Sequence, residues 1–190
     1  MNKAKLLAAS LCLAATASSS FGARFYAQPS IAIAEVDGFD ATVGGSLAAG
    51  FIFADKHALE IDFSQFSVDD NYSDSFSSGE LQYDFKPVLL SYRYEFPITA
   101  KLYGSIGASI GATFQEISSR QTFTSIFGPG TWNYERKDEA FTAGFSAGIG
   151  YRFTDHVAAF LSAKTLRASK SDVLSENTYS ILQLGLNCRF

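Results

Sequence analysis

The chain has 190 residues, of which 47% are hydrophobic, 15% aromatic and 18% charged, and its formal net charge is −4. This content of Phe and Tyr excludes a disordered chain, and without an excess of Lys and Arg the protein lacks the means to neutralise nucleic-acid phosphates. No nucleic-acid partner is therefore expected.

Residues 1–23 are predicted to be a signal peptide that is cleaved off. Two lysines precede an apolar run over residues 6–15, and small residues follow that run. The succession of a basic, an apolar and a small-residue segment is typical of secretory signals. Residues 24–190 are expected to form one exported domain, in which Cys188 has no disulfide partner.

From residue 25 onward, the dominant period of the sequence is two. In residues 102–115 the large apolar side chains share one parity, and Gly, Ser and Thr share the other. Residues 141–153 repeat this scheme, which is typical of strands with two unlike faces. The same period predicts eight strands in all, over residues 24–35, 43–54, 58–68, 83–96, 102–115, 141–153, 157–166 and 179–190.

The predicted connections alternate in length. They are short after the second, fourth and sixth strands and long after the third, fifth and seventh, with the longest over residues 116–140. This alternation predicts an all-β fold, an eight-stranded antiparallel up-and-down transmembrane β-barrel. A soluble barrel is less favoured, because the polar face is mostly Gly, Ser and Thr, which suits a narrow lumen better than a soluble exterior.

Two positions break the pattern. Pro29 lies inside the first strand, where it predicts a bulge or a later strand start. The apolar parity changes at Phe66 and Val68, which predicts a bulge in the third strand or its emergence from the bilayer. The seventh strand alternates weakly, so either of its two faces could point into the lumen.

Aromatic residues end the even-numbered strands at the short-turn end. They are predicted to form half of an aromatic girdle at the membrane boundary, although aromatic residues also favour strands in general. The girdle residues are Phe51, Phe53, Tyr92, Tyr94, Phe96, Tyr151 and Phe153.

Charged residues on the polar face gather toward the same end. Charges removed from water need partners, so they are predicted to form an ion-pair network inside the lumen. The alternative is that they point into a wet lumen without specific partners. The residues are Glu60, Asp62, Arg93, Glu95, Arg152, Arg189 and, higher in the barrel, Lys164, with Lys86 expected near the far rim. The large apolar side chains expected inside are Ile52, Leu89 and Phe160 alone.

The segments KPVLLSYRYEF, LYGSIGASIGATF and the terminal ILQLGLNCRF resemble the small outer-membrane β-barrels of OmpA-barrel and OmpX type. The resemblance covers nearly all of residues 24–190. It implies a monomer among outer-membrane lipids, inserted by the barrel-assembly machinery through a terminal signal that ends at Phe190. The outer membrane of a Gram-negative-type cell is the expected location.

No catalytic, metal or cofactor site is predicted. The two histidines, His57 and His156, lie in short turns far from the long-loop end, so a lipid-modifying barrel enzyme is a disfavoured alternative. Function is expected in the loops, where Phe127, Trp132 and Tyr134 could contact an extracellular protein or glycan in adhesion. An OmpW-like narrow channel or transporter of small hydrophobic molecules is the other alternative.

Overall fold

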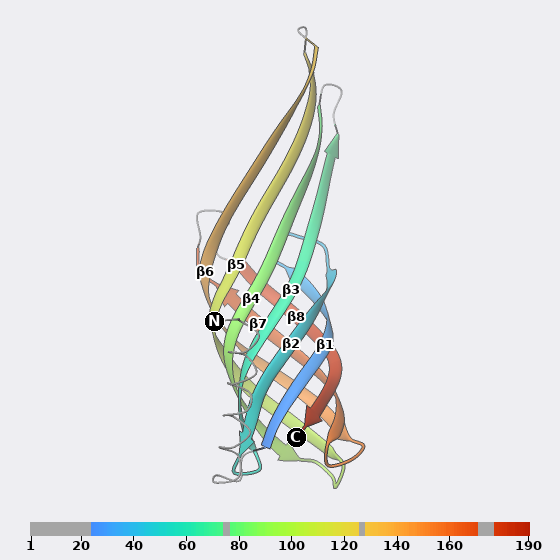
Figure 1. The fold of residues 1–190 in the computed structure, drawn as a ribbon, viewed down its shortest axis with the longest axis vertical. Helices are drawn as coiled ribbons and strands as arrows, with labels where there is room; N and C mark the ends of the chain where they lie inside the picture. Colours follow the sequence, from blue (N-terminus) through green and yellow to red (C-terminus); the bar gives the residue numbers. More distant parts are fainter. Residues whose placement is uncertain (1–23, 74–76, 126–127, 171–176) are drawn as a thin grey trace, which may run out of the picture.

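The computed structural model describes residues 24–73, 77–125, 128–170 and 177–190, which form a closed barrel of eight antiparallel strands (Figure 1). Neighbours in the chain are neighbours in the sheet, and β1 closes the ring by pairing with β8. The strands are β1 (Arg24–Val36), β2 (Thr42–Phe53), β3 (His57–Ser73), β4 (Ser77–Pro97), β5 (Leu102–Ser125), β6 (Gly128–Arg152), β7 (Val157–Ala168) and β8 (Asn177–Arg189). The predicted fold class is confirmed.

The alternation of the sequence decides which side chains face the lumen. In β8, Ile181 and Gln183 are buried while Leu182 and Leu184 are exposed on the outer surface. In β7, Lys164 is buried and Leu161 is exposed, so this weakly alternating strand has the same arrangement. None of the described residues belongs to a helix with the length and hydropathy of a membrane span.

Pro29 lies within β1 and causes no bulge. It pairs with Leu47 of β2, and the register between β1 and β8 is the same before and after it. Only the pairs of Gln28 and Pro29 with β8 are missing from that ladder. The predicted bulge or late start is wrong, because the missing donor of one proline does not outweigh the register held by the two adjoining strands.

β3 also runs without a bulge. Its register with β4 is unchanged from His57 to Ser73, and Asp62, Ser64, Phe66 and Val68 are all buried on one face. The predicted bulge is therefore wrong, whereas the alternative, that the apolar parity changes where the strand leaves the bilayer, is compatible with this unbroken register. The inner face of this strand changes from polar to apolar along its length, whereas the strand geometry stays the same.

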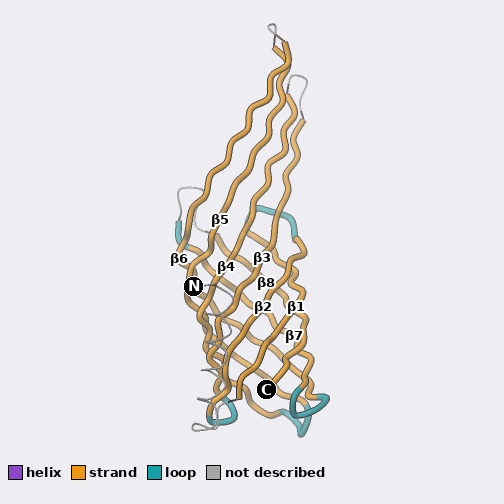
Figure 2. Tube along the Cα trace, in the orientation of Figure 1, coloured by secondary structure: helices purple, strands orange, loops and turns teal. Residues whose placement is uncertain are grey.

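Four strands continue well beyond the rest of the barrel (Figures 1 and 2). Residues 69–80 and 116–140 were predicted to be loops, but β3 and β4 pair as far as Ser73 and Ser78, and β5 and β6 as far as Ser125 and Gly128. β4 and β5 pair over the same stretch, so the four strands form one sheet. We call residues 66–73, 77–86, 114–125 and 128–141 the projecting sheet. Beyond the apolar residues at its base, this sheet has no opposite wall to pack against, so its sequence does not alternate regularly between polar and apolar residues.

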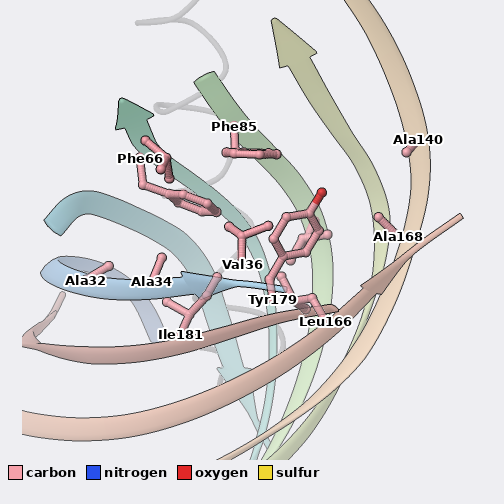
Figure 3. Packing of buried hydrophobic residues seen from close by; sticks show 12 residues of the cluster. Ala32, Ala34, Val36, Phe66, Phe85, Ala140, Leu166, Ala168, Tyr179 and Ile181 are labelled. Atoms are coloured by element: carbon pink, nitrogen blue, oxygen red, sulfur yellow. The ribbon is translucent and has the colours of Figure 1, made fainter. Parts of the chain in front are cut away.

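Buried apolar side chains fill the upper lumen at the base of the projecting sheet, which contributes Phe66, Val68, Phe85 and Ala140 to them. Phe66 and Phe85 stack with ring centroids 5.4 Å apart, and Tyr179 meets Phe85 edge to face at 5.5 Å. Figure 3 shows these rings close to one another, with aliphatic side chains beside them. The upper apolar cluster consists of Ala32, Ala34, Val36, Phe66, Val68, Phe85, Leu89, Ala140, Leu166, Ala168, Tyr179 and Ile181.

Glycine is needed where strands and side chains crowd the barrel wall. A Cβ at Gly111 of β5 would lie 2.1 Å from the carbonyl oxygen of Val88 and 2.9 Å from the Cα of Leu89. At Gly45 of β2 an added Cβ would have no atom within 4 Å. The two glycines therefore stand in opposite steric situations on the same barrel.

Substitution Gly111→Ala should lower the free energy of unfolding by about 1–3 kcal/mol, because the added methyl overpacks the wall. Gly45→Ala is the matched control and should change it by less than about 1 kcal/mol. Urea titration of the folded barrel in detergent, followed by mobility on unboiled gels, measures both. Equal stability of the two variants would contradict the assignment of crowding to Gly111.

Candidate functional site

A buried carboxylate organises the lower lumen. Glu95 of β4 is 2% exposed, and its oxygens lie 3.0 Å from Nη2 of Arg189 on β8 and 3.3 Å from Nη2 of Arg152 on β6. Arg93, on the same strand as Glu95, places Nη2 3.6 Å from it. One carboxylate thus meets three guanidinium groups from three strands, which links distant parts of the barrel wall.

Glu60 of β3 extends this network. Its carboxylate lies 3.2 Å from Nη1 of Arg93 and accepts a hydrogen bond from the Tyr26 hydroxyl. The Arg93 guanidinium lies over the Tyr26 ring, 5.2 Å from its centroid, and Arg152 lies 4.9 Å from the centroid of Tyr103. Rings and carboxylates together offset the desolvation of the arginines.

A second ion pair lies in the same lumen, between Asp62 of β3 and Lys164 of β7. Both side chains are at most 5% exposed. Asp62 also accepts hydrogen bonds from Ser64 at 3.1 Å and Ser46 at 3.4 Å. A void of about 30 Å³ between the two groups, lined in part by Arg93 and Lys164, is no larger than a small water site.

The seven lumen residues selected from the sequence lie in these two groups, which we call the lower lumen network. The expectation for Lys86 is wrong: it shares the outward parity of Val88 and pairs with Glu116 at 3.3 Å. Residues that the sequence reasoning missed have the inward parity of their strands, which was the available signal. They are Tyr26, Gln28, Tyr103 and Asn187, and Gln28 accepts a hydrogen bond from Arg93 at 2.8 Å.

The upper lumen departs from expectation. Ile52, Leu89 and Phe160 are buried as predicted, yet they are not the only large apolar side chains inside. Phe66, Phe85, Tyr179, Leu166 and the rest of the upper apolar cluster also face inward. Tyr179 accepts a hydrogen bond from Gln115 at 2.9 Å, so the polar end of its ring is satisfied. Side chains thus occupy the lumen both at its lower network and at its upper cluster.

The seven aromatic residues selected for a girdle all have outward parity near the short turns. Phe53, Tyr92, Phe96, Tyr151 and Phe153 are exposed, and the other two are partly buried. Neighbouring rings contact each other, as in Tyr151 and Phe153 with centroids 5.4 Å apart. The assembly-signal residue Phe190 is 76% exposed, and its backbone N–H donates to the Phe25 carbonyl at 2.8 Å.

The projecting sheet has two unlike faces. Trp132 and Tyr134 of β6 share the parity of the lumen wall and stack on each other with centroids 5.7 Å apart. They are 55% and 39% exposed. A hollow of about 450 Å³ on the opposite face is lined mostly by polar residues, among them Arg120 and Asn133, and Tyr134 also borders it. Phe127, the third contact residue expected from the sequence, lies outside the described residues.

Charge pairs hold the outward face of the sheet where it leaves the barrel. Glu116 lies 3.2 Å from Nζ of Lys137 and 3.3 Å from Nζ of Lys86. Hydrogen bonds from Lys137 and then Lys86 lower the pKa of the Glu116 carboxyl. Hydrogen bonds to Glu135 and then Glu116 raise the pKa of Lys137. These opposite shifts show that each group favours the charged form of its partner.

The histidines lie in and beside the short turns. Nδ1 of His57 is 2.5 Å from the Tyr92 hydroxyl, and Nδ1 of His156 is 3.2 Å from the Arg189 carbonyl oxygen. Within the described ranges, no group of three His, Cys, Asp or Glu side chains is arranged to hold a metal ion. His57 is the first residue of β3 and lies among the rings of Phe53, Tyr92 and Tyr94, and His156 contacts a backbone carbonyl.

Replacing Lys164 with Met should destabilise the barrel by about 3–5 kcal/mol, because Asp62 is left buried without its counter-ion. The double variant Asp62→Asn, Lys164→Met should recover most of this loss. The exposed pair Arg24–Asp55, at 2.6 Å, is the control, since Arg24→Ala should cost less than about 1 kcal/mol. Urea unfolding in detergent measures these variants and the single variant Asp62→Asn, and additive losses at Asp62 and Lys164 would contradict the pairing.

Solved structures with the same fold have low sequence identity to this chain. Neisserial surface protein A is 16% identical with a TM-score of 0.59, covering 87% of this chain and 97% of its own. Ail of Yersinia pestis, solved with the heparin analogue sucrose octasulfate, is 18% identical with a TM-score of 0.53, covering 88% and 97%. A major outer membrane protein of Thermus thermophilus is 11% identical with a TM-score of 0.56, covering 88% and 99%.

The comparison with curated proteins finds no match. The family of the outer membrane protein beta-barrel domain, however, matches residues 4–190. This match, the closed eight-stranded barrel and the solved outer-membrane barrels place the protein in the Gram-negative outer membrane. The chain belongs to the outer membrane protein beta-barrel domain family.

Proposed function

We propose that this protein is a structural outer-membrane barrel whose projecting sheet binds an extracellular protein. The observation that supports the proposal best is the exposed stack of Trp132 and Tyr134, on the face of the sheet that continues the lumen wall. Exposed aromatic anchors of this kind dominate the binding energy of protein interfaces. Because Trp132 and Tyr134 lie on a strand that pairs with β5, they can meet a partner with little loss of backbone entropy.

Residues near the stack extend its apolar surface. Tyr134 lies on β6 opposite Ser119 of β5, which pairs with Leu81 of β4. In the next row toward the barrel, Tyr83 pairs with Ile117. Leu81, Tyr83 and Ile117 are all partly buried, so the face offers aliphatic and aromatic contacts on adjacent strands. This composition matches the centre of a protein interface.

The charge of the projecting sheet favours a protein over a sulfated glycan. Its described residues include twice as many acidic as basic side chains: Asp69, Asp70, Glu80, Asp84, Glu116, Glu135, Asp138 and Glu139 against Lys86, Arg120, Arg136 and Lys137. A polyanion would be repelled by this excess. The Ail structure contains a heparin analogue, but its fold relationship alone does not transfer that ligand to an acidic sheet.

Substitution Trp132→Ala should weaken partner binding at least about tenfold, equivalent to roughly 1.4 kcal/mol, and Tyr134→Ala should act in the same direction. Both changes should leave barrel stability unaltered, because the two side chains lie outside the barrel core. The measurement is adhesion of cells displaying each variant to cultured host cells, with gel mobility of the unboiled protein as the test of folding.

Asn133→Ala is the matched control, because Asn133 lies between the two aromatic residues on the opposite face. Treating the host cells with protease should abolish adhesion, whereas added heparin should leave it unchanged. Adhesion that survives both aromatic substitutions, or that heparin removes, would contradict the proposal.

The side chains that fill the lumen argue against the alternative of a transport function. The lower lumen network and the upper apolar cluster lie at two levels of the lumen, and an eight-stranded barrel is only wide enough for its own side chains. Among the described residues, the histidines give an enzymatic function no support, since His57 contacts a tyrosine hydroxyl and His156 a backbone carbonyl. Binding through the projecting sheet therefore fits the molecule better than transport or catalysis.

Purified protein reconstituted in liposomes should not accelerate the entry of small sugars, because filled cross-sections block the lumen. Liposome swelling in isotonic sugar measures this, with an open porin in the same vesicles as the positive control. Swelling above that of empty liposomes would favour the channel alternative.

A further inference from the structure

The connection between β1 and β2 lies at the foot of the projecting sheet (Figure 1) and carries one aromatic residue, Phe39. Phe39 donates its backbone N–H to the Val36 carbonyl at 2.9 Å, which closes a turn with Gly38 at its third position. The φ of Gly38 is 87°, a value that glycine adopts readily at this position of a turn. Asp37 donates to the Thr178 carbonyl at 3.0 Å, so the turn is also bonded to β8.

The Phe39 ring packs on two rings of β4. Its centroid lies 4.7 Å from that of Tyr83 and 6.4 Å from that of Phe85, and aromatic pairs attract each other at such distances. Phe85 is fully buried, whereas Phe39 and Tyr83 are partly exposed. Phe39 and Tyr83 therefore form an outer layer of the upper apolar cluster, on which they pack.

Tyr83 connects this outer layer to the stack of Trp132 and Tyr134. Tyr83 and Tyr134 share one face of the projecting sheet and lie two strands and one side-chain row apart. With strands about 4.8 Å apart and same-face residues about 6.8 Å apart along a strand, their Cα atoms are about 12 Å apart. A standard interface covers about 800 Å² of each partner, roughly 28 Å across. One partner is therefore large enough to cover both places.

The surroundings of Phe39 indicate the chemistry of such a partner. Phe39 and Tyr83 still expose apolar surface, and burying that surface against another apolar group is favourable. Asp37 and Asp40 flank Phe39 in the chain, and both are exposed. An apolar side chain with Lys or Arg beside it therefore complements this part of the surface better than one with acidic neighbours.

We propose that Phe39 contacts the same extracellular protein as the stack of Trp132 and Tyr134, through a partner segment in which an apolar side chain is flanked by basic ones. This inference rests on the proposed function and names part of the partner's chemistry. The apolar side chain packs on Phe39 and Tyr83, and its basic neighbours lie beside Asp37 and Asp40. The binding surface thus extends from the projecting sheet onto the connection between β1 and β2.

The test is adhesion of cells displaying each variant to cultured host cells. Substitution Phe39→Ala should lower adhesion at least about fivefold, and the charge reversal Asp40→Lys at least about threefold. Leu166→Val is the matched control for stability, because it trims a fully buried member of the upper apolar cluster and leaves the surface unchanged. Its adhesion should equal that of wild type, while urea unfolding in detergent compares its loss of stability with that of Phe39→Ala.

The outcomes separate this inference from the proposed function. If Trp132→Ala lowers adhesion and Phe39→Ala does not, the contact at Phe39 is overturned and the proposed function stands. If neither variant lowers adhesion, both are overturned. Equal losses for Leu166→Val and Phe39→Ala would assign the effect to barrel stability and overturn the contact.

Two further variants complete the experiment. If Phe39→Ala does not fold by gel mobility, Phe39→Leu takes its place, because leucine still covers the cluster but lacks the ring. Wild-type adhesion of Phe39→Leu would then overturn the contact. Asp40→Asn should lower adhesion less than Asp40→Lys, and wild-type adhesion of Asp40→Lys would overturn the basic flanks.

Discussion

The hydrocarbon layer offers no water to hydrogen-bond a peptide group, so every strand in it needs a neighbour on both sides. The pairing of β1 with β8 meets this requirement by closing the ring. Closure also explains why Pro29 causes no bulge: it lacks a backbone donor, but the strands on either side hold β1 in register. Once the ring is closed, period-two alternation places every second side chain in a narrow lumen and the others in lipid.

A narrow lumen has to be filled, and this barrel fills it in two ways. Near the short turns, Glu95 meets three arginines and Asp62 meets Lys164, so charges removed from water have partners from strands far apart in sequence. Higher in the barrel, the rings of Phe66, Phe85 and Tyr179 pack together. The lower lumen network and the upper apolar cluster both narrow the lumen, and both join opposite walls of the barrel. The projecting sheet continues from these joined walls.

Above the bilayer the constraint is relaxed, because water can satisfy the edges of a sheet. β3 to β6 continue there as four strands without closing into a ring (Figure 1). Their inner face, with Trp132 and Tyr134, no longer has an opposite wall to pack against. The closed barrel thus anchors the chain in the membrane, and the open sheet, which the same strands form, carries the proposed binding surface.

The number of strands, their order and the face of most side chains could be predicted from the sequence, because alternation is a local property of the extended chain. The same alternation assigned the seven lumen charges to inner faces. The contacts of Glu95 with three arginines, the extra length of β3 to β6 and the packing of Phe66 and Phe85 in the upper lumen appear only in the folded barrel. These outcomes depend on strand tilt and register, which bring together residues as distant in sequence as Asp62 and Lys164, and no local pattern encodes them.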